Sequence, residues 1–141
     1  MLGNEKFVRI DPCRAEVRSV ICIDTNIIIY IANGTLGEDI VGDEPIICPS
    51  IVHIECLGYP SIKSIEEQRI RELCATLTTA PLTDNIIESA IKLRQDKKMS
   101  LGDSIVAATA LENDSQLWTA DTKDFEHIDG LDVFNPLTKP I

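Results

Sequence analysis

The stretch Val20 to Asn26, with the sequence VICIDTN, decides the fold class of this chain. Its first four residues are apolar and mostly β-branched, which predicts a short buried strand. Asp24, Thr25 and Asn26 follow directly, and residues of these types favour turns and helix caps. A buried strand that ends in a polar corner is typical of a parallel sheet, in which sites gather at the carboxyl ends of the strands.

Strand-like and helix-like segments alternate beyond this corner. Further short strands are predicted at 46–48, 116–119 and 131–134. Helices are predicted to begin at Ser50, at the capping box Ser64-Ile-Glu-Glu67, at Thr83 and at Ser100. This alternation predicts an α/β domain with a largely parallel central sheet.

The segment Ile27 to Ala32 fits two structures. Its four isoleucines suit a strand by propensity, whereas Asn33-Gly34 ends it as a helix C-cap would. Periodicity does not choose between the two. In the helix predicted after it, the spacing of Ile51, Ile54 and Leu57 predicts one apolar face.

Length and composition predict one folded domain. The chain has 141 residues, of which 44% are hydrophobic, enough to build a core and too many for a disordered acidic tail. The first residues carry mixed charges and no sustained period. We therefore expect an N-terminal extension of uncertain structure at 1–19, a domain at 20–136 and a short tail at 137–141.

The charge and the cysteines exclude several classes of protein. The 23 acidic residues outnumber the 13 basic ones, so the net charge of −10 argues against a protein that simply coats nucleic acid. Five cysteines without a C-x-x-C pair indicate neither a disulfide framework nor a zinc ribbon. They are interpreted as buried apolar residues in a reducing compartment. Because no apolar run approaches the length of a membrane span or a signal peptide, we expect a soluble cytoplasmic protein without membrane contact.

Four carboxylates stand where separate elements would bring them to a site: Asp24, Glu55, Asp103 and Asp121. They are far apart in the sequence, so only the fold can gather them. Such a cluster suits metal-assisted hydrolysis of phosphodiesters, because Mg²⁺ prefers hard oxygen ligands from one or more carboxylates. Two ions about 3.5–4 Å apart can activate water and stabilise both the attacking and the leaving oxygen.

Each acid also has an ordinary structural interpretation. Asp24 can cap a turn or a helix. Asp103 is the acidic member of a capping box that starts at Ser100. Glu55 can be a solvated helix residue, and Asp121 can belong to a turn. The alternatives remain open for each residue taken alone.

Other polar residues are weaker candidates. Lys92, Arg94, Lys97 and Lys98 form a local basic cluster, which is interpreted as a solvated helix end or as a contact to RNA phosphate. His53 and His127 have no other histidine or cysteine at metal-ligand spacing, so both are interpreted as structural or surface residues.

Taken together, four segments resemble the PIN domain family in the expected order. They are DTN at 24–26, SIVHIE at 50–55, GDSIVAATA at 102–110 and TADTKDF at 119–125. The likeness covers roughly residues 20–136 and is greatest to the VapC-type ribonuclease toxins. The residues before Val20 exceed a typical start of this family.

The resemblance implies a three-layer α/β/α fold in which 27–32 is a helix. It implies an endoribonuclease that uses one or two Mg²⁺ or Mn²⁺ ions, cuts structured RNA such as transfer or ribosomal RNA, is held inactive by an antitoxin, and forms a homodimer. Matched residue by residue, the catalytic and metal-binding acids are Asp24, Glu55, Asp103 and Asp121, with Asp124 in reserve for the fourth acid. Thr25, Asn26 and Thr119 match supporting polar residues.

Two other functions remain open for the same residues. One is a PIN nuclease that processes RNA without an antitoxin. The other is a catalytically silent PIN-like scaffold that binds RNA or protein.

Overall fold

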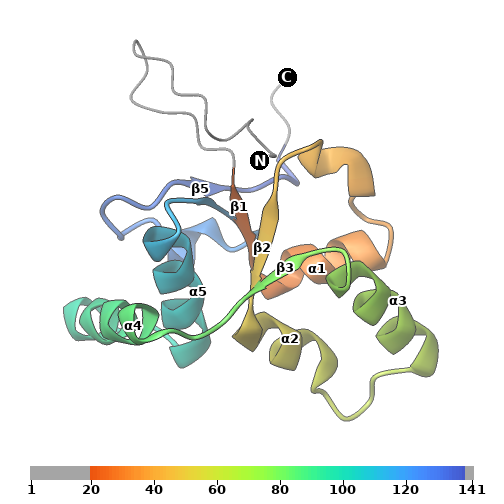
Figure 1. Ribbon diagram of the computed structural model, residues 1–141, viewed down its shortest axis with the longest axis horizontal. Coiled ribbons are helices and arrows are strands. Elements are labelled where there is room, and N and C mark those ends of the chain that lie inside the picture. Colours follow the sequence, from red (N-terminus) through yellow and green to blue (C-terminus); the bar gives the residue numbers. More distant parts are fainter. Residues whose placement is uncertain (1–19, 139–141) are drawn as a thin grey trace.

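The computed structural model describes residues 20–138 of the chain, so the predicted extension at 1–19 and residues 139–141 of the tail lie outside it. The described part alternates strands and helices (Figure 1). In chain order the elements are β1 (Ile21–Ile23), α1 (Thr25–Ala32), the 3₁₀ turn η2 (Glu38–Val41), β2 (Ile46–Pro49), α2 (Ser50–Leu57), α3 (Ser64–Cys74), β3 (Thr78–Ala80), α4 (Asp84–Asp96), α5 (Leu101–Glu112), β4 (Gln116–Trp118), the 3₁₀ turn η3 (Thr122–Asp124) and β5 (Val133–Phe134).

The five strands form one parallel sheet in the order β3-β2-β1-β4-β5. Figure 1 shows α1 and α3 on one side of the strands and α4 and α5 on the other, which confirms the predicted three-layer α/β/α fold. Ile23 of β1 pairs with Trp118 of β4, so the residues that follow these two strands emerge next to each other. The carboxyl ends of β2, β1 and β4 therefore meet at one edge of the sheet.

The segment that sequence patterns left open is helical, as the resemblance implies. Helix α1 begins after Asp24, whose side chain accepts a hydrogen bond from the backbone N–H of Thr25. Ile27, Ile28 and Ile31 are buried on its inner side. Burial of these residues against the sheet outweighs the strand preference of isoleucine, which is a weak and context-dependent effect.

The apolar face predicted for α2 is wrong at Ile54, which is 70% exposed. Ile51 and Leu57 are half-buried and pack against the core, as predicted. The fully buried residues of this helix are Val52 and Cys56, which were not predicted. Ser50 does not cap the helix either, because its hydroxyl donates to the backbone carbonyl of Ala80 in β3. Strand β3 was not predicted. Its pairing with β2 brings the Ala80 carbonyl within hydrogen-bond distance of the Ser50 hydroxyl.

Helix starts were predicted with mixed success. Thr83 caps α4 and Ser100 caps α5, each through its side-chain oxygen, as expected. At α3 the cap lies one residue earlier than predicted: Lys63 is the N-cap, and the Glu66 carboxylate accepts its backbone N–H. Local side-chain chemistry thus marked where the helices begin, to within a residue.

The main hydrophobic core lies between the layers. It includes Phe125, Leu117 and Val106, all fully buried, and the rings of Trp118 and Phe134 pack with centroids 5.1 Å apart. Four cysteines, Cys22, Cys48, Cys56 and Cys74, are buried and free of disulfides, as predicted, whereas Cys13 lies outside the described residues. Within 20–138, no helix is both long enough and apolar enough to span a bilayer.

Candidate acidic site

Asp24 lies at the centre of the edge where the strands end. It directly follows β1 and is only 6% exposed. One of its carboxylate oxygens, Oδ1, accepts the backbone N–H of Thr25 at 2.8 Å, and the other, Oδ2, accepts the hydroxyl of Thr119 at 2.8 Å. Asp24 therefore caps α1 and also faces the end of β4, so the cap and the site interpretations hold at once.

Thr119 and Asn26 join the corners that follow β1 and β4. The Thr119 hydroxyl, which donates to Asp24, accepts the backbone N–H of Asp121 at 3.0 Å. The Asn26 side chain accepts the backbone N–H of Ala120 at 3.0 Å and donates to Oδ2 of Asp121 at 3.1 Å. These bonds fix Asp121 beside Asp24, although nearly a hundred residues separate them in the chain.

Glu55 reaches the same place from α2. The Thr25 hydroxyl donates to its Oε1 at 2.6 Å, so the first turn of α1 holds this carboxylate. Gly102, in the first turn of α5, lies against the other oxygen: a Cβ on Gly102 would be 2.5 Å from Glu55 Oε2. The absence of a side chain at Gly102 thus allows Glu55 to approach α5. This role of Gly102 was not predicted, although the residue directly precedes Asp103 in the motif.

Asp103 completes the group from the start of α5. Its backbone N–H donates to the Ser100 hydroxyl at 3.0 Å, as the capping interpretation predicts. Burial raises the pKa of the Asp103 carboxyl, and the charges of Asp124, Glu55 and Asp121 raise it further, while the Ser100 hydroxyl lowers it. The Asp103 side chain therefore faces the other acids, while its backbone N–H donates to the capping residue Ser100.

The pKa of Asp24 shows how crowded the group is. Burial raises this pKa from 3.8 to about 6 against the opposing hydrogen bonds from Thr119 and Thr25, and the nearby charges of Asp103 and Glu55 add to the increase. Desolvation and like charge both disfavour an ionised carboxylate. Asp103 and Glu55 thus act electrostatically on Asp24, and Glu55 and Asp121 act on Asp103.

A model of the PIN domain family matches residues 21–131 of the chain. The chain belongs to the PIN domain family.

Solved structures of similar fold agree with this assignment. The chain is similar to a chain of a toxin-antitoxin complex from Klebsiella pneumoniae, with 30% identity, a TM-score of 0.66, and coverage of 82% of this chain and 97% of that one. VapBC2 from Rickettsia felis, bound to a DNA fragment from its promoter, gives 19% identity, a TM-score of 0.72 and coverage of 82% and 98%. The chain is also similar to a chain of VapBC-1 from nontypeable Haemophilus influenzae, with 19% identity, a TM-score of 0.69, and coverage of 84% of this chain and 99% of that one. The chain matches no curated protein sequence.

Asp121 and Asp124 both lie at the site of this PIN domain. Asp121 is the acid that Asn26 holds by a hydrogen bond. Asp124, at the end of η3, exerts the strongest charge effect on Asp103. Both residues thus act on Asp103 through their charges, and the choice of Asp121 as fourth acid, with Asp124 in reserve, stays a prediction.

The donor chemistry of this edge suits a divalent cation. In the described part of the chain, however, no three residues among His, Cys, Asp and Glu are arranged as a ready-made metal cage. Hydrogen bonds from Thr25 and Thr119 already occupy both oxygens of Asp24. Mg²⁺ commonly binds through one or two carboxylates and completes its shell with water, so a full protein cage is not required. A cation there would offset both the burial and the like charges that raise the pKa of Asp24.

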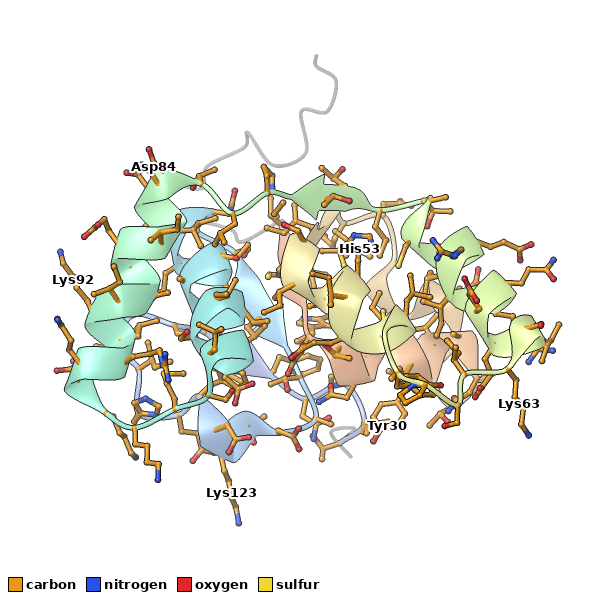
Figure 2. The ribbon with its side chains drawn as sticks, turned by 90° about the horizontal axis from the view of Figure 1, so that it is seen from below. Tyr30, His53, Lys63, Asp84, Lys92 and Lys123 are labelled. Carbon is orange, nitrogen blue, oxygen red and sulfur yellow. The ribbon has the colours of Figure 1, made fainter. Side chains whose placement is uncertain are left out.

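The predicted basic cluster lies apart from the tight hydrogen-bond network. Lys92 is on the outer side of α4 and points away from the molecule (Figure 2). Arg94 donates to the backbone carbonyl of Met99 beyond the end of α4, which supports the helix-end interpretation. Lys123 was not singled out from the sequence, yet it lies on η3 between Asp121 and Asp124 and is exposed.

The two histidines take no part in the acidic network. His53, on α2, pairs its Nε2 with the Thr79 hydroxyl of β3 at 3.1 Å, on the side of α2 that faces β3 (Figure 2). His127 has a buried Nε2 without a hydrogen-bond partner. Both positions agree with the structural interpretation.

Replacing Gly102 with alanine tests the approach of Glu55 to α5. Helix propensity favours alanine by about 1 kcal/mol, so the melting temperature should stay the same or rise. The new Cβ would displace Glu55 Oε2, and Mn²⁺ affinity measured by calorimetry should fall about tenfold, because small displacements at such sites are costly. Glu112→Ala, exposed at the far end of α5, is the control. Unchanged Mn²⁺ affinity in Gly102→Ala would contradict this role.

The raised pKa of Asp24 predicts how stability depends on pH without metal. The folded protein retains the Asp24 proton up to about pH 6, whereas the unfolded chain loses it near 3.8, so stability falls as pH rises between these values. The loss from this group should approach about 3 kcal/mol. Urea unfolding from pH 4 to 8 should show a smaller loss in Asp24→Asn than in the parent. Parallel profiles for the two proteins would refute the assignment.

Proposed function

We propose that this PIN domain is a metal-dependent endoribonuclease that hydrolyses phosphodiester bonds of structured RNA, of the transfer or ribosomal class, and is the toxin of a toxin–antitoxin pair. The observation that carries the proposal is the convergence of Asp24, Glu55, Asp103 and Asp121 at the edge where β2, β1 and β4 end. The similarity to VapBC complexes supports the toxin part of the proposal.

The proposed roles of the acids follow from their contacts. Asp24, Glu55, Asp103 and Asp121 hold one or two Mg²⁺ or Mn²⁺ ions, which supply Lewis acidity and lower the pKa of water at the site. Thr25 orients Glu55, and Thr119 orients Asp24. Asn26 holds Asp121 at a fixed place relative to both.

Asp103 is proposed here as a metal ligand. Burial and the charges of Asp124, Glu55 and Asp121 raise the pKa of its carboxyl when no metal is bound. A cation held by the cluster would favour the charged form of this carboxyl. Hydrolysis requires a water to approach the phosphorus in line while the 3′ oxygen leaves.

Binding of RNA must overcome the net charge of −10. Lys123 of η3, which lies between Asp121 and Asp124 in the sequence, would contact a phosphate next to the scissile bond. The cluster of Lys92, Arg94, Lys97 and Lys98 would serve more distant phosphates. With so few cations, binding should be selective and sensitive to salt.

Substitution of the acids tests the catalytic proposal. Asp24→Asn and Asp103→Asn should each abolish cleavage of a structured RNA in Mg²⁺ or Mn²⁺ while the melting temperature is retained or increased, because each removes a ligand and a crowded charge. Asp84→Asn, on the opposite side of the molecule from Lys123 in Figure 2, should cleave like the parent. Cleavage by purified Asp24→Asn at the parental rate would show the assignment to be wrong.

A silent scaffold is the alternative that the geometry keeps open. It is favoured by the lack of a ready-made cage of three metal-binding side chains within the described range. Calorimetry separates the two functions. No Mn²⁺ binding at millimolar concentrations would favour the scaffold and exclude the metal-dependent nuclease.

An antitoxin partner distinguishes the toxin from an RNA-processing nuclease of the same family. A hollow between α1 and α3, lined by Ile29, Tyr59, Arg69 and Ile70, offers a place for a partner segment with apolar anchors. Expression with and without the adjacent gene, followed by sequencing of RNA 5′ ends, gives the discriminating result. Cuts that appear only without that gene favour the toxin, and cuts that persist with it favour the processing enzyme.

The homodimer has a candidate surface on α4 and α5. Leu82, Ile87, Ile91 and Leu101 lie along this surface with exposed fractions of 39–58%, around a hollow that Ala90 and Ile105 also line. A group of large, exposed apolar side chains more often marks a surface that binds another molecule than a surface that stays open to solvent. We propose that a second copy of the chain covers them, and Leu101 would place the interface next to the acidic site.

Light scattering tests this dimer. Ile91→Glu should convert the protein from the mass of a dimer to that of a monomer, because an unpaired charge would be buried at the interface. Ile65→Glu changes a comparably exposed isoleucine on α3 and should leave the dimer intact. A monomeric parent, or a dimeric Ile91→Glu, would contradict this surface.

A further inference from the structure

A cavity of about 310 Å³ that the proposed nuclease does not use lies where β2 begins. Its floor is apolar and includes side chains from α1, β2 and α3, namely Ile31, Ile46 and Leu73. Its rim is acidic and consists of three exposed residues, Glu38, Asp43 and Glu44. Among the residues that the structure describes, no lysine or arginine lines this cavity. It therefore suits a segment that carries both apolar side chains and positive charge.

The chain enters the domain beside this cavity. The backbone N–H of Ile21 donates to the carbonyl of Pro45 at 2.9 Å, and Ile21 pairs with Ile46 in the sheet. Pro45 and Ile46 both line the cavity. Strands β1 and β2 begin at the same edge of the sheet (Figure 1). Residues 1–19 are therefore joined to the domain next to the cavity.

Residues 1–19 differ in charge from the rest of the chain. They carry four basic and three acidic side chains, whereas residues 20–141 carry nine and twenty. The segment Lys6 to Ile10, with the sequence KFVRI, holds three apolar side chains and two cations. The ten residues between Ile10 and Ile21 can span up to about 35 Å, so this segment can reach a cavity that adjoins Pro45. It matches the cavity both in apolar character and in charge.

We propose that the segment Lys6 to Ile10 of the chain itself binds in the cavity at the start of β2. Its apolar side chains contact the floor of the cavity, and its two cations face the acidic rim. Burial of apolar surface supplies the attraction, while the charges favour a basic segment and are weakened by salt. Because the segment is tethered next to the cavity, its effective concentration there is high, and no second molecule is needed.

The cavity continues along α1 and α3 toward the hollow proposed above for a partner segment. Ile31, Glu38 and Leu73 also line a second hollow between these two helices. That second hollow shares Ala32 and Arg69 with the partner's hollow. The bound segment would thus border the place proposed for the partner. The inference concerns this chain's own residues and stands whether or not the acidic site cleaves RNA.

Photochemical cross-linking of the full chain tests this contact. Phe7 is replaced by p-benzoylphenylalanine, which keeps an aromatic ring and bonds to a neighbouring C–H group on illumination. Digestion and mass spectrometry should show the peptide that contains residue 7 joined to peptides from 38–46 or 73–78, in a product with the mass of one chain. Links to other surfaces, links between two chains, or the absence of any link would each overturn the proposal.

A matched pair of double variants tests the role of charge. Glu38→Lys with Glu44→Lys reverses two acids of the rim, whereas Glu88→Lys with Glu112→Lys reverses two exposed acids on α4 and α5. The yield of the cross-link should fall about fivefold in the rim variant, because attraction becomes repulsion, and should stay at the parental level in the other. Equal yields in the two variants would overturn the proposal. Because the cross-links of the chain with an unchanged rim already support or overturn it, the test holds even if a rim variant fails to fold.

Discussion

The hydrogen bond from the Thr119 hydroxyl to the buried carboxylate of Asp24 is the contact on which the site depends. It exists because β1 and β4 are parallel neighbours, with Ile23 opposite Trp118, so that both strands end at the same level. Asn26 and the N–H groups of Ala120 and Asp121 extend the contact into a network. A shift of the register between β1 and β4 would separate Asp24 from Thr119 and remove the partners that keep a buried carboxylate tolerable.

The same network holds together charges that oppose folding. Asp24 and Asp103 both have raised pKa values, since burial and neighbouring acids disfavour their charged forms. A domain that served stability alone would not gather acids from α2, from α5 and from the segments that follow β1 and β4 at one edge. Perturbed carboxylates in a cluster are typical of functional sites, and the polar residues Thr25, Asn26 and Thr119 offset part of their repulsion.

Gly102 and the buried residues of α2 show how closely this helix is fitted between its neighbours. On one side, the missing side chain of Gly102 admits Glu55 toward α5. On the other side, Val52 and Cys56 are fully buried in the core. The position of Glu55 is thus set by packing on both sides of a two-turn helix, and not by the acidic network alone.

The sequence by itself determined the alternation of strands and helices, most of the helix starts and the four acids, because these depend on neighbouring residues. Thr83 and Ser100 cap their helices through contacts three residues away, which a sequence pattern shows directly. The buried side of α2 could not be predicted in this way, since the helix packs against α1, α5, α3 and β2, and Ile54 is left exposed.

Only the tertiary structure decided the rest. Strand β3 is short and half-exposed, with no apolar run to indicate it, and its pairing with β2 is what defines it. The helical state of 27–32, the close approach of Gly102 and Glu55, and the position of Lys123 likewise arise from residues distant in the chain. Sequence patterns record short-range preferences, whereas these features depend on which surfaces the parallel sheet brings together.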